Sequence, residues 1–418
     1  MERLISLILL LTVSSLAFGS TSPSFGKVFK VSPSGPLVSI AEAVRPAAAG
    51  DTVLVYPGVY YEKGLVIDKP IHLTGVGQPT LDGEHRYEIV TIRCSGVTME
   101  GFVVRHSGYS DWNDLAGIRL VAVRHVIIRN NTLDDTFFGL YCQNSDSCVL
   151  ANNTLHSRSD SSRQAGNGIH CWHCNGMQLL NNTITRHRDG IYFEFVTNSL
   201  IRGNRSFYNM RYGLHFMFSH HDVYESNTFE HNEAGVSVMF SHGVNMKGNL
   251  FADNQGGGAY GILLKEITDS RLEQSRFVHN TVAIYMEGTT RVQVCQNVFR
   301  DNGWALKVQA SCSDDTITKN NFLGNTFDIA TNGSLVLNNF DRNYWDKYDG
   351  YDLNRDGFGD VPYHPVSLYA MVAEKNSSVM MLYHSFIVSL LDRTEKVMPS
   401  ITPADLVDHI PSMKPLTL

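Results

Sequence analysis

The densest set of potential metal ligands in the sequence is the segment His170-Cys171-Trp172-His173-Cys174. Its thiols and imidazoles, with C-x-x-C spacing between the cysteines, are ligand types that zinc and copper prefer. Alternation along a strand would direct His170 outward and Cys171 inward, so all four ligands converge only if the chain bends. A disulfide, or burial of the thiols in the core, is the alternative to a metal site.

Methionine and histidine side chains recur at equal distances further along the chain. Met217 and Met239 are 22 residues apart, and so are His220 and His242. Thioether sulfur and imidazole nitrogen suit copper(I), whereas Ca²⁺ and Mg²⁺ prefer oxygen. These residues can form one site only in a fold that stacks residues 22 positions apart.

An acidic loop near the C-terminal end offers oxygen ligands. Its oxygen-bearing side chains stand at positions 1, 3, 5 and 9 of an EF-hand-like loop and are Asp352, Asn354, Asp356 and Asp360. Gly357 occupies the turn position, and the carbonyl of Phe358 can complete the ligand set, but position 12 is Tyr363 rather than Glu. The pattern predicts a Ca²⁺ site, and the alternative is a loop closed by Asx turns without an ion.

The elements that must position these residues belong to a repeat of about 22 residues. A glycine or alanine followed by an aliphatic or aromatic residue opens a short β-rich run, and successive openings lie 22, 29, 22, 23, 22, 26, 22 and 22 residues apart. The openings are Gly117, Gly139, Gly168, Gly190, Gly213, Gly235, Gly261, Ala283 and Ala305. The period is too short for most helical repeats and suits coils made of short strands.

A column of asparagines runs parallel to the glycines, each two residues before a bulky apolar residue. Its members are Asn131, Asn153, Asn182, Asn204, Asn227, Asn249, Asn297 and Asn320, with Ser275 filling one gap. Asparagine tolerates turn conformations and can hydrogen-bond the backbone of a neighbouring coil. We therefore predict an all-β fold, a parallel β-helix that is right-handed by the general preference of parallel crossovers.

Alternation within the first strand of each coil assigns its side chains to two faces. Cys142 and Cys171 fall on the inner face. On the outer face, Met217 and Met239 become neighbours on adjacent coils, about 4.8 Å apart. The predicted copper(I) site comprises His215, Met217, Met239, His220, His242 and His170. The alternative is an apolar groove in which a partner docks.

The ends of the chain differ from the repeat. Residues 1–19 carry a short apolar run and small residues at Ala17 and Gly19, which predict a cleaved signal peptide. The alternative is an uncleaved anchor, although an apolar run this short would span a bilayer poorly. Residues 20–365 form the predicted β-helix, with a capping helix over 38–49 that covers its open end. Residues 366–418 are predicted as a helical docking tail, whose apolar run is too short to span a bilayer. Packing of that tail back onto the β-helix is the alternative.

Composition excludes some partners. The formal net charge is −7, from 34 basic and 41 acidic residues, and no long basic run exists, so nucleic acid is not expected as a partner. The seven cysteines form no disulfide framework, and their odd number leaves at least one unpaired within the chain.

Several segments together give the chain a resemblance to the NosD family. They are HRDGIYFEFV (187–196), RYGLHFMFSH (211–220), YGILLKEI (260–267), NGWALKV (302–308), NYWDKYDGYDLNRDGFGDVPY (343–363) and ITPADLVD (401–408). Asparagine ladders alone occur in many sugar-active β-helices, so the blocks within 187–267 and 343–363 carry the likeness. The His170–Cys174 cluster is not part of it.

The resemblance implies a periplasmic accessory protein for maturation of nitrous oxide reductase. The resemblance implies that such a protein docks on the permease of an ABC transporter, which works with its ATPase. It further implies that the protein handles copper, with sulfur as a second candidate cargo, downstream of a copper chaperone. The resemblance thus implies no enzymatic activity, and contact with the membrane only through the transporter. Two alternatives remain: a polysaccharide hydrolase, lyase or epimerase, and a metal-free scaffold that docks a client enzyme to a transporter. Glycoside hydrolysis needs two flanking carboxyl groups, and the adjacent pairs Asp134-Asp135 and Asp314-Asp315 are expected to be solvated loop residues.

Overall fold

The computed structural model of the chain describes residues 26–110, 112–158, 165–333, 337–382 and 406–417, with single residues between 385 and 391. The predicted signal peptide lies outside the described residues. Among the described residues, no helix has the length and apolar character needed to cross a membrane.

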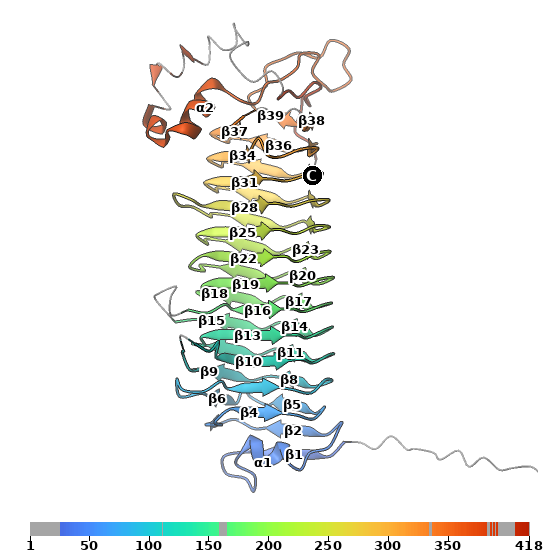
Figure 1. Cartoon of the computed structure of the whole chain (residues 1–418), viewed down its shortest axis with the longest axis vertical. Coiled ribbons are helices and arrows are strands. Elements are labelled where there is room, and N and C mark those ends of the chain that lie inside the picture. The colour runs from blue at the N-terminus through green and yellow to red at the C-terminus, as the bar shows by residue number, and fades with distance from the viewer. Residues whose placement is uncertain are drawn as a thin grey trace, which may run out of the picture.

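The described chain winds into a stack of coils, from α1 at one end to β39 and α2 at the other (Figure 1). Each coil contributes one strand to each of three parallel sheets, with neighbouring strands in a sheet coming from successive coils. The predicted right-handed parallel β-helix is confirmed. We call the 14-stranded, 13-stranded and 12-stranded sheets A, B and C.

Sheet A contains β1 (Val28–Val31), β2 (Thr52–Val55), β5 (His72–Gly75), β8 (Thr98–Glu100), β11 (Ile127–Arg129), β14 (Val149–Ala151), β17 (Gln178–Leu180), β20 (Leu200–Arg202), β23 (Val223–Glu225), β26 (Asn245–Lys247), β29 (Arg271–Glu273), β32 (Gln293–Cys295), β35 (Thr316–Thr318) and β38 (Asn339–Asp341). Sheet B contains β3 (Val59–Tyr60), β6 (Thr80–Asp82), β9 (Val103–Arg105), β12 (Thr132–Asp134), β15 (Thr154–His156), β18 (Thr183–Thr185), β21 (Arg205–Phe207), β24 (Thr228–Glu230), β27 (Leu250–Ala252), β30 (Arg276–Val278), β33 (Val298–Arg300), β36 (Asn321–Leu323) and β39 (Tyr344–Trp345). Sheet C contains β4 (Leu65–Ile67), β7 (Val90–Ile92), β10 (Ala116–Val121), β13 (Phe138–Gln143), β16 (Ile169–Trp172), β19 (Asp189–Glu194), β22 (Tyr212–Met217), β25 (Ala234–Met239), β28 (Tyr260–Lys265), β31 (Val282–Glu287), β34 (Trp304–Val308) and β37 (Phe327–Ala330).

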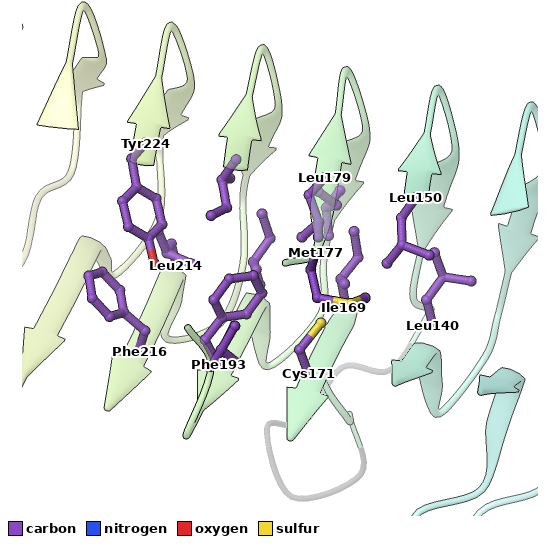
Figure 2. Packing of buried hydrophobic residues seen from close by; sticks show 14 of the residues in the cluster. Leu140, Leu150, Ile169, Cys171, Met177, Leu179, Phe193, Leu214, Phe216 and Tyr224 are labelled. Atoms are coloured by element: carbon purple, nitrogen blue, oxygen red, sulfur yellow. The ribbon is translucent and has the colours of Figure 1, made fainter. Parts of the chain in front are cut away.

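The core fills the inside of the coils, as alternation predicts. Figure 2 shows Cys171, Phe193 and Phe216 pointing into the interior from successive strands of sheet C, and all three are fully buried. Inward side chains of sheet B form an aromatic stack in which consecutive ring centroids lie 4.1–5.7 Å apart. The stack consists of Phe229, Phe251, Phe277, Phe299, Phe322 and Trp345.

The glycine column is required by the close approach of successive coils. A Cβ placed on Gly190 would lie 2.6 Å from the carbonyl oxygen of Gly213, and one on Gly139 would lie 2.4 Å from that of Gly168. Because side chains rarely tolerate such contacts, the first strand of these coils opens with glycine rather than a larger residue.

The predicted asparagine ladder is confirmed. Where two asparagines are consecutive, the Oδ1 of the second accepts hydrogen bonds from the backbone N–H and the Nδ2 of the first; between Asn182 and Asn204 both distances are 2.9 Å. A second ladder, which the sequence analysis missed, runs along the turn before sheet C and comprises Asn209, Asn232, Asn254, Asn280, Asn302 and Asn325. Buried backbone N–H groups at both turns thereby find acceptors.

Both ends of the stack are covered. Helix α1 (Ile40–Val44) is shorter than the predicted 38–49, since Pro46 cannot continue a helix; its Ile40, Ala43 and Val44 are buried. At the other end, Asp408 accepts hydrogen bonds from N and Nδ2 of Asn343 at 3.0 and 3.1 Å and from Nε1 of Trp345 at 3.0 Å. Asp408 thus closes the first asparagine ladder.

The C-terminal region is only partly the helical tail that the sequence predicted. Helix α2 (Leu368–Lys375) is followed by a 3-10 helix, η1 (Ser377–Leu382). Tyr369, Ala370 and Ala373 pack against outward side chains of the last coils of sheet C, and Lys307 pairs with Glu374 at 2.6 Å. Residues 406–417 contain no helix and pack back on the final coils. The helix expected from residue 366 is present as α2, and residues 406–417 of the predicted helical tail instead form an extended segment held at Asp408.

Candidate metal-binding face

The outer face of sheet C brings two thioethers together. Met217 on β22 pairs in register with Met239 on β25, and both side chains are partly buried. Glu194 precedes Met217 in the same row, and Lys265 follows Met239. The prediction that the two methionines are neighbours on adjacent coils is therefore confirmed. In this row the two thioether side chains lie between one acidic and one basic residue.

His220 and His242 lie further along the same two coils. Their rings stack with centroids 4.0 Å apart, and the backbone N–H of His242 donates to Nδ1 of His220 at 3.3 Å. Burial and the neighbouring His242 and His221 lower the pKa of His220. This favours the neutral imidazole, which is the metal-binding form, and leaves Nε2 of His220 as its available ligand.

An exposed aromatic row separates the methionines from these histidines. His173, Phe195, Phe218 and Phe240 stack over four successive coils, with centroid separations of 4.6, 5.3 and 5.2 Å. All four residues have a positive φ near 50°. The sequence analysis missed this row; the signal was available, since each residue directly follows the second outward position of its coil.

His215 is covered rather than solvent-facing. Tyr192 and Tyr212 lie against its ring with centroids at 5.1 and 4.8 Å, and both ring nitrogens are buried without a hydrogen-bond partner. Its Nδ1 lies 3.9 Å from Asp189. Burial raises the pKa of Asp189, but the Arg211 guanidinium and the nearby His215 ring outweigh it and leave a net lowering. The expectation that the outer face is open to solvent is wrong here, because alternation sets direction but not exposure.

His170 does not join the methionine pair. It lies two strands away from β22 in sheet C, between Tyr141 and Tyr192, with Asn167 Nδ2 3.1 Å from its Nδ1. Burial and the nearby Arg188 lower its pKa to about 3. The imidazole is neutral, but its neighbours are tyrosines and an amide rather than sulfur ligands.

The ligands of the His170–Cys174 segment point in different directions. Cys171 and Cys174 are buried, and Cys171 pairs in register with Cys142. Burial raises the pKa of Cys171 well above its usual value, which keeps its thiol protonated and inert. His173 instead stacks on Phe195 outside the coil. All seven cysteines are unpaired within the described residues. The thiols of Cys171 and Cys174 therefore lie in the core, rather than in a disulfide.

The acidic loop uses many of its oxygens for turns. Asp352 accepts from the N–H groups of Asp356 and Gly357 at 3.2 and 2.9 Å, and Asp360 accepts from Leu353 at 2.6 Å. The Asp356 carboxylate accepts from the N–H of Phe358, and Asn354 Oδ1 from the N–H of Asp356. Gly357 has φ +90°, as its turn position requires. This is the Asx-turn arrangement, and calcium binding stays a prediction.

Comparison with known proteins agrees with the fold and with the resemblance. A family model described as "Periplasmic copper-binding protein (NosD)" matches residues 156–350. The "Probable ABC transporter binding protein NosD" of Pseudomonas aeruginosa is 27% identical over 404 residues, covering 85% of this chain and 86% of that protein. The chain is similar to the NosD proteins over most of its length. The protein of the same name from Stutzerimonas stutzeri is 25% identical and covers 86% of each chain.

Solved structures similar to this chain share its fold at low identity. The A-module of the Azotobacter vinelandii mannuronan C-5 epimerase AlgE6 has a TM-score of 0.52 and 14% identity, covering 72% of this chain and 94% of that one. The Dettilon tailspike protein has a TM-score of 0.53 and 12% identity, covering 70% and 62%. Identities this low support the β-helix and no activity. The curated NosD relatives are named as binding proteins, not enzymes.

Proposed function

We propose that the chain is a periplasmic, non-enzymatic protein that handles copper together with an ABC transporter during assembly of the copper centres of nitrous oxide reductase. The matched family description and the names of the curated relatives support copper and transporter association. The observation that carries the copper assignment is the in-register pair of Met217 and Met239. A copper chaperone is the expected donor, and sulfur is a second possible cargo.

The spacing of the coils suits one copper(I) ion. Strands in a parallel sheet lie about 4.8 Å apart, and metal–sulfur bonds are about 2.3 Å in the comparable thiolate case. Two sulfurs on opposite sides of one ion would therefore be separated by nearly one coil spacing. His220 and His242 provide imidazoles on the same two coils. His170 lies two strands away from β22, and His215 is covered by tyrosines.

Replacing both methionines tests the copper site. The Met217→Ala/Met239→Ala variant should bind copper(I) at least about tenfold more weakly than the wild type, since even loss of a supporting partner of a ligand typically costs that much. The measurement is competition against a chromophoric copper(I) chelator. Met210→Ala, a partly buried methionine on the same coil as Met217, is the matched control. Equal copper affinity in wild type and double variant would rule out this pair.

Exposed apolar side chains beyond α2 are the proposed contact with the transporter permease. Met381 is 90% exposed and Phe386 is 80% exposed, whereas Val388 packs inward with α2. Large apolar side chains this open to solvent at one end of the stack are suited to burial by a partner. Contact with the membrane would follow through the transporter.

Charge substitution tests the docking without disturbing the end of the solenoid. Met381→Glu/Phe386→Glu should abolish co-purification with the tagged transporter, whereas Trp112→Glu should not, although Trp112 is 94% exposed. Deleting residues 376–418 would be a poorer test, because it also removes Asp408 and leaves the buried donors of the last coil without an acceptor. Retention of the double variant on the transporter would reject this contact.

A polysaccharide-active enzyme is not favoured by the carboxylates. Asp134 is engaged by Arg158 and His156. Asp315 is buried rather than solvated, which corrects the expectation from its loop position; burial raises its pKa to about 6, and it accepts from the N–H of Val292 at 2.8 Å. Asp134 is thus engaged by side chains of the next coil, and Asp315 by the backbone of the preceding coil.

A further inference from the structure

Three potential metal ligands meet at the turn that follows sheet B near the N-terminal end. His106 directly follows β9 and Asp135 directly follows β12, on adjacent coils. His85 belongs to the turn after β6, where its backbone N–H donates to the carbonyl oxygen of His106 at 2.8 Å. All three lie outside residues 156–350, which match the family model. They also lie on other coils than Met217 and Met239.

The three side chains are close enough to share one ion. Each can offer one ligand atom such that all three atoms lie within 4.8 Å of one another, and no other group of three histidine, cysteine, aspartate or glutamate residues in the described chain does so. The rings of His85 and His106 stack with centroids 4.4 Å apart. His85 is exposed and the other two residues are partly buried, so small rotations can close the remaining distance to typical metal bonds of about 2.0–2.2 Å.

A buried carboxylate orients His106. Nδ1 of His106 lies 3.1 Å from both oxygens of Asp82, which is almost fully buried and also accepts from Nε of Arg105 at 2.9 Å. This leaves Nε2 of His106 as its ligand nitrogen. A histidine whose second nitrogen is held by a carboxylate is the usual arrangement behind a metal ligand, because it fixes the ring and its tautomer.

The turn that carries His85 is built to approach His106. A Cβ on Gly83 would lie 2.6 Å from the carbonyl oxygen of His106 and 2.8 Å from a side-chain carbon of Ile89. Only glycine at this position lets the segment after β6 come close enough for the two imidazoles to stack. The backbone, not only the side chains, therefore holds the cluster together.

We propose that His85, His106 and Asp135 form a binding site for one divalent transition-metal ion, with Asp82 as the positioning residue. Two imidazoles and one carboxylate suit Zn²⁺ and similar borderline ions, and leave a further coordination position open. The site has no sulfur ligand, so it differs in metal preference from the methionine pair. This proposal is independent of the proposed copper-handling function.

Zinc titration of the metal-free full chain tests the site. Wild type should bind Zn²⁺ in a calorimetric titration, and His85→Ala or Asp135→Ala should weaken that binding at least about tenfold. Asp82→Asn should weaken it by about 10–100-fold. His125→Ala is the matched control, because His125 is also an exposed histidine with a φ of 55°. Met217→Ala/Met239→Ala should leave zinc binding unchanged.

A second readout locates the ion. Zn²⁺ should protect His85 from modification by diethylpyrocarbonate, detected by mass spectrometry, while His125 stays reactive. Because His85 is exposed, its replacement is not expected to unfold the chain, and circular dichroism checks this. Equal zinc affinity in wild type and His85→Ala, or a matching loss in His125→Ala, would overturn the proposal. So would a His85 side chain that stays as reactive with Zn²⁺ as without it.

Discussion

Replacing Asp408 with alanine is expected to lower the free energy of unfolding by about 3–5 kcal/mol. The buried carboxylate accepts from Asn343, Trp345 and the backbone N–H of Arg342. Each buried donor left without an acceptor costs about 1–3 kcal/mol. Urea denaturation followed by circular dichroism measures the change, and hydrogen exchange should show the largest loss of protection at the N–H of Asn343.

Two further variants separate the ladder contact from a general effect of charge. Asp408→Asn keeps one oxygen for Asn343 and should cost less than Asp408→Ala. Asp356→Ala, in the exposed acidic loop, removes an aspartate without a buried donor and should leave the coils unaffected. Equal stability of Asp408→Ala and wild type would show that the last coil does not depend on this seal.

The contribution of Asp222 to the free energy of unfolding should fall as pH rises from about 4 to about 8. This contribution is obtained by comparing wild type with Asp222→Asn. This carboxyl group is fully buried, has one hydrogen bond from the N–H of Ser199 at 2.8 Å, and its other oxygen has no partner. Burial raises its pKa to about 8, against about 3.9 in an unfolded chain. The folded state thus binds the proton of Asp222 more tightly than the unfolded state does. The resulting stabilisation is fully present below pH ~4 and is lost as the pH rises to about 8.

The asparagine variant provides the reference for this titration. It keeps an oxygen for Ser199 and cannot ionise, so the difference in unfolding free energy between variant and wild type should grow with pH by at most about 1.4 kcal/mol per unit. Urea denaturation across the range measures it. Asp269→Asn is a suitable contrast, because the Asp269 side chain is exposed and its hydrogen bond with Arg291 lowers its pKa. A difference for Asp222→Asn that does not vary between pH 4 and 8 would contradict the assignment.

Local patterns predicted most of the architecture. The glycine column, the first asparagine ladder and the Met217–Met239 contact all follow from one period and from alternation along strands. The second ladder beginning at Asn209 obeys the same period and was missed because its members precede glycine strands rather than bulky apolar residues. Repeats place residues reliably, since every coil is held by the same contacts as its neighbours.

Exposure and long-range contacts were beyond those patterns. His215 points outward as predicted, but its burial depends on Tyr192 and Tyr212, which come from its own and a neighbouring strand. The contact of Asn343 with Asp408 spans 65 residues and connects the repeat to a non-repetitive segment. The cluster of His85, His106 and Asp135 arises where coil spacing is irregular. The 22-residue period therefore does not predict this cluster.

The seal at Asp408 also has a consequence for how the molecule is made. Domains generally form from the N-terminal side during synthesis, so coils near α1 can assemble while later segments are still being produced. The final coil at Asn343 must wait for a residue made 65 positions later. Until Asp408 has been synthesised, the N–H and Nδ2 donors of Asn343 have no acceptor from this residue. Completion of the solenoid therefore requires synthesis of the chain at least as far as Asp408, and a product that stops before this residue would leave the last coil without its acceptor.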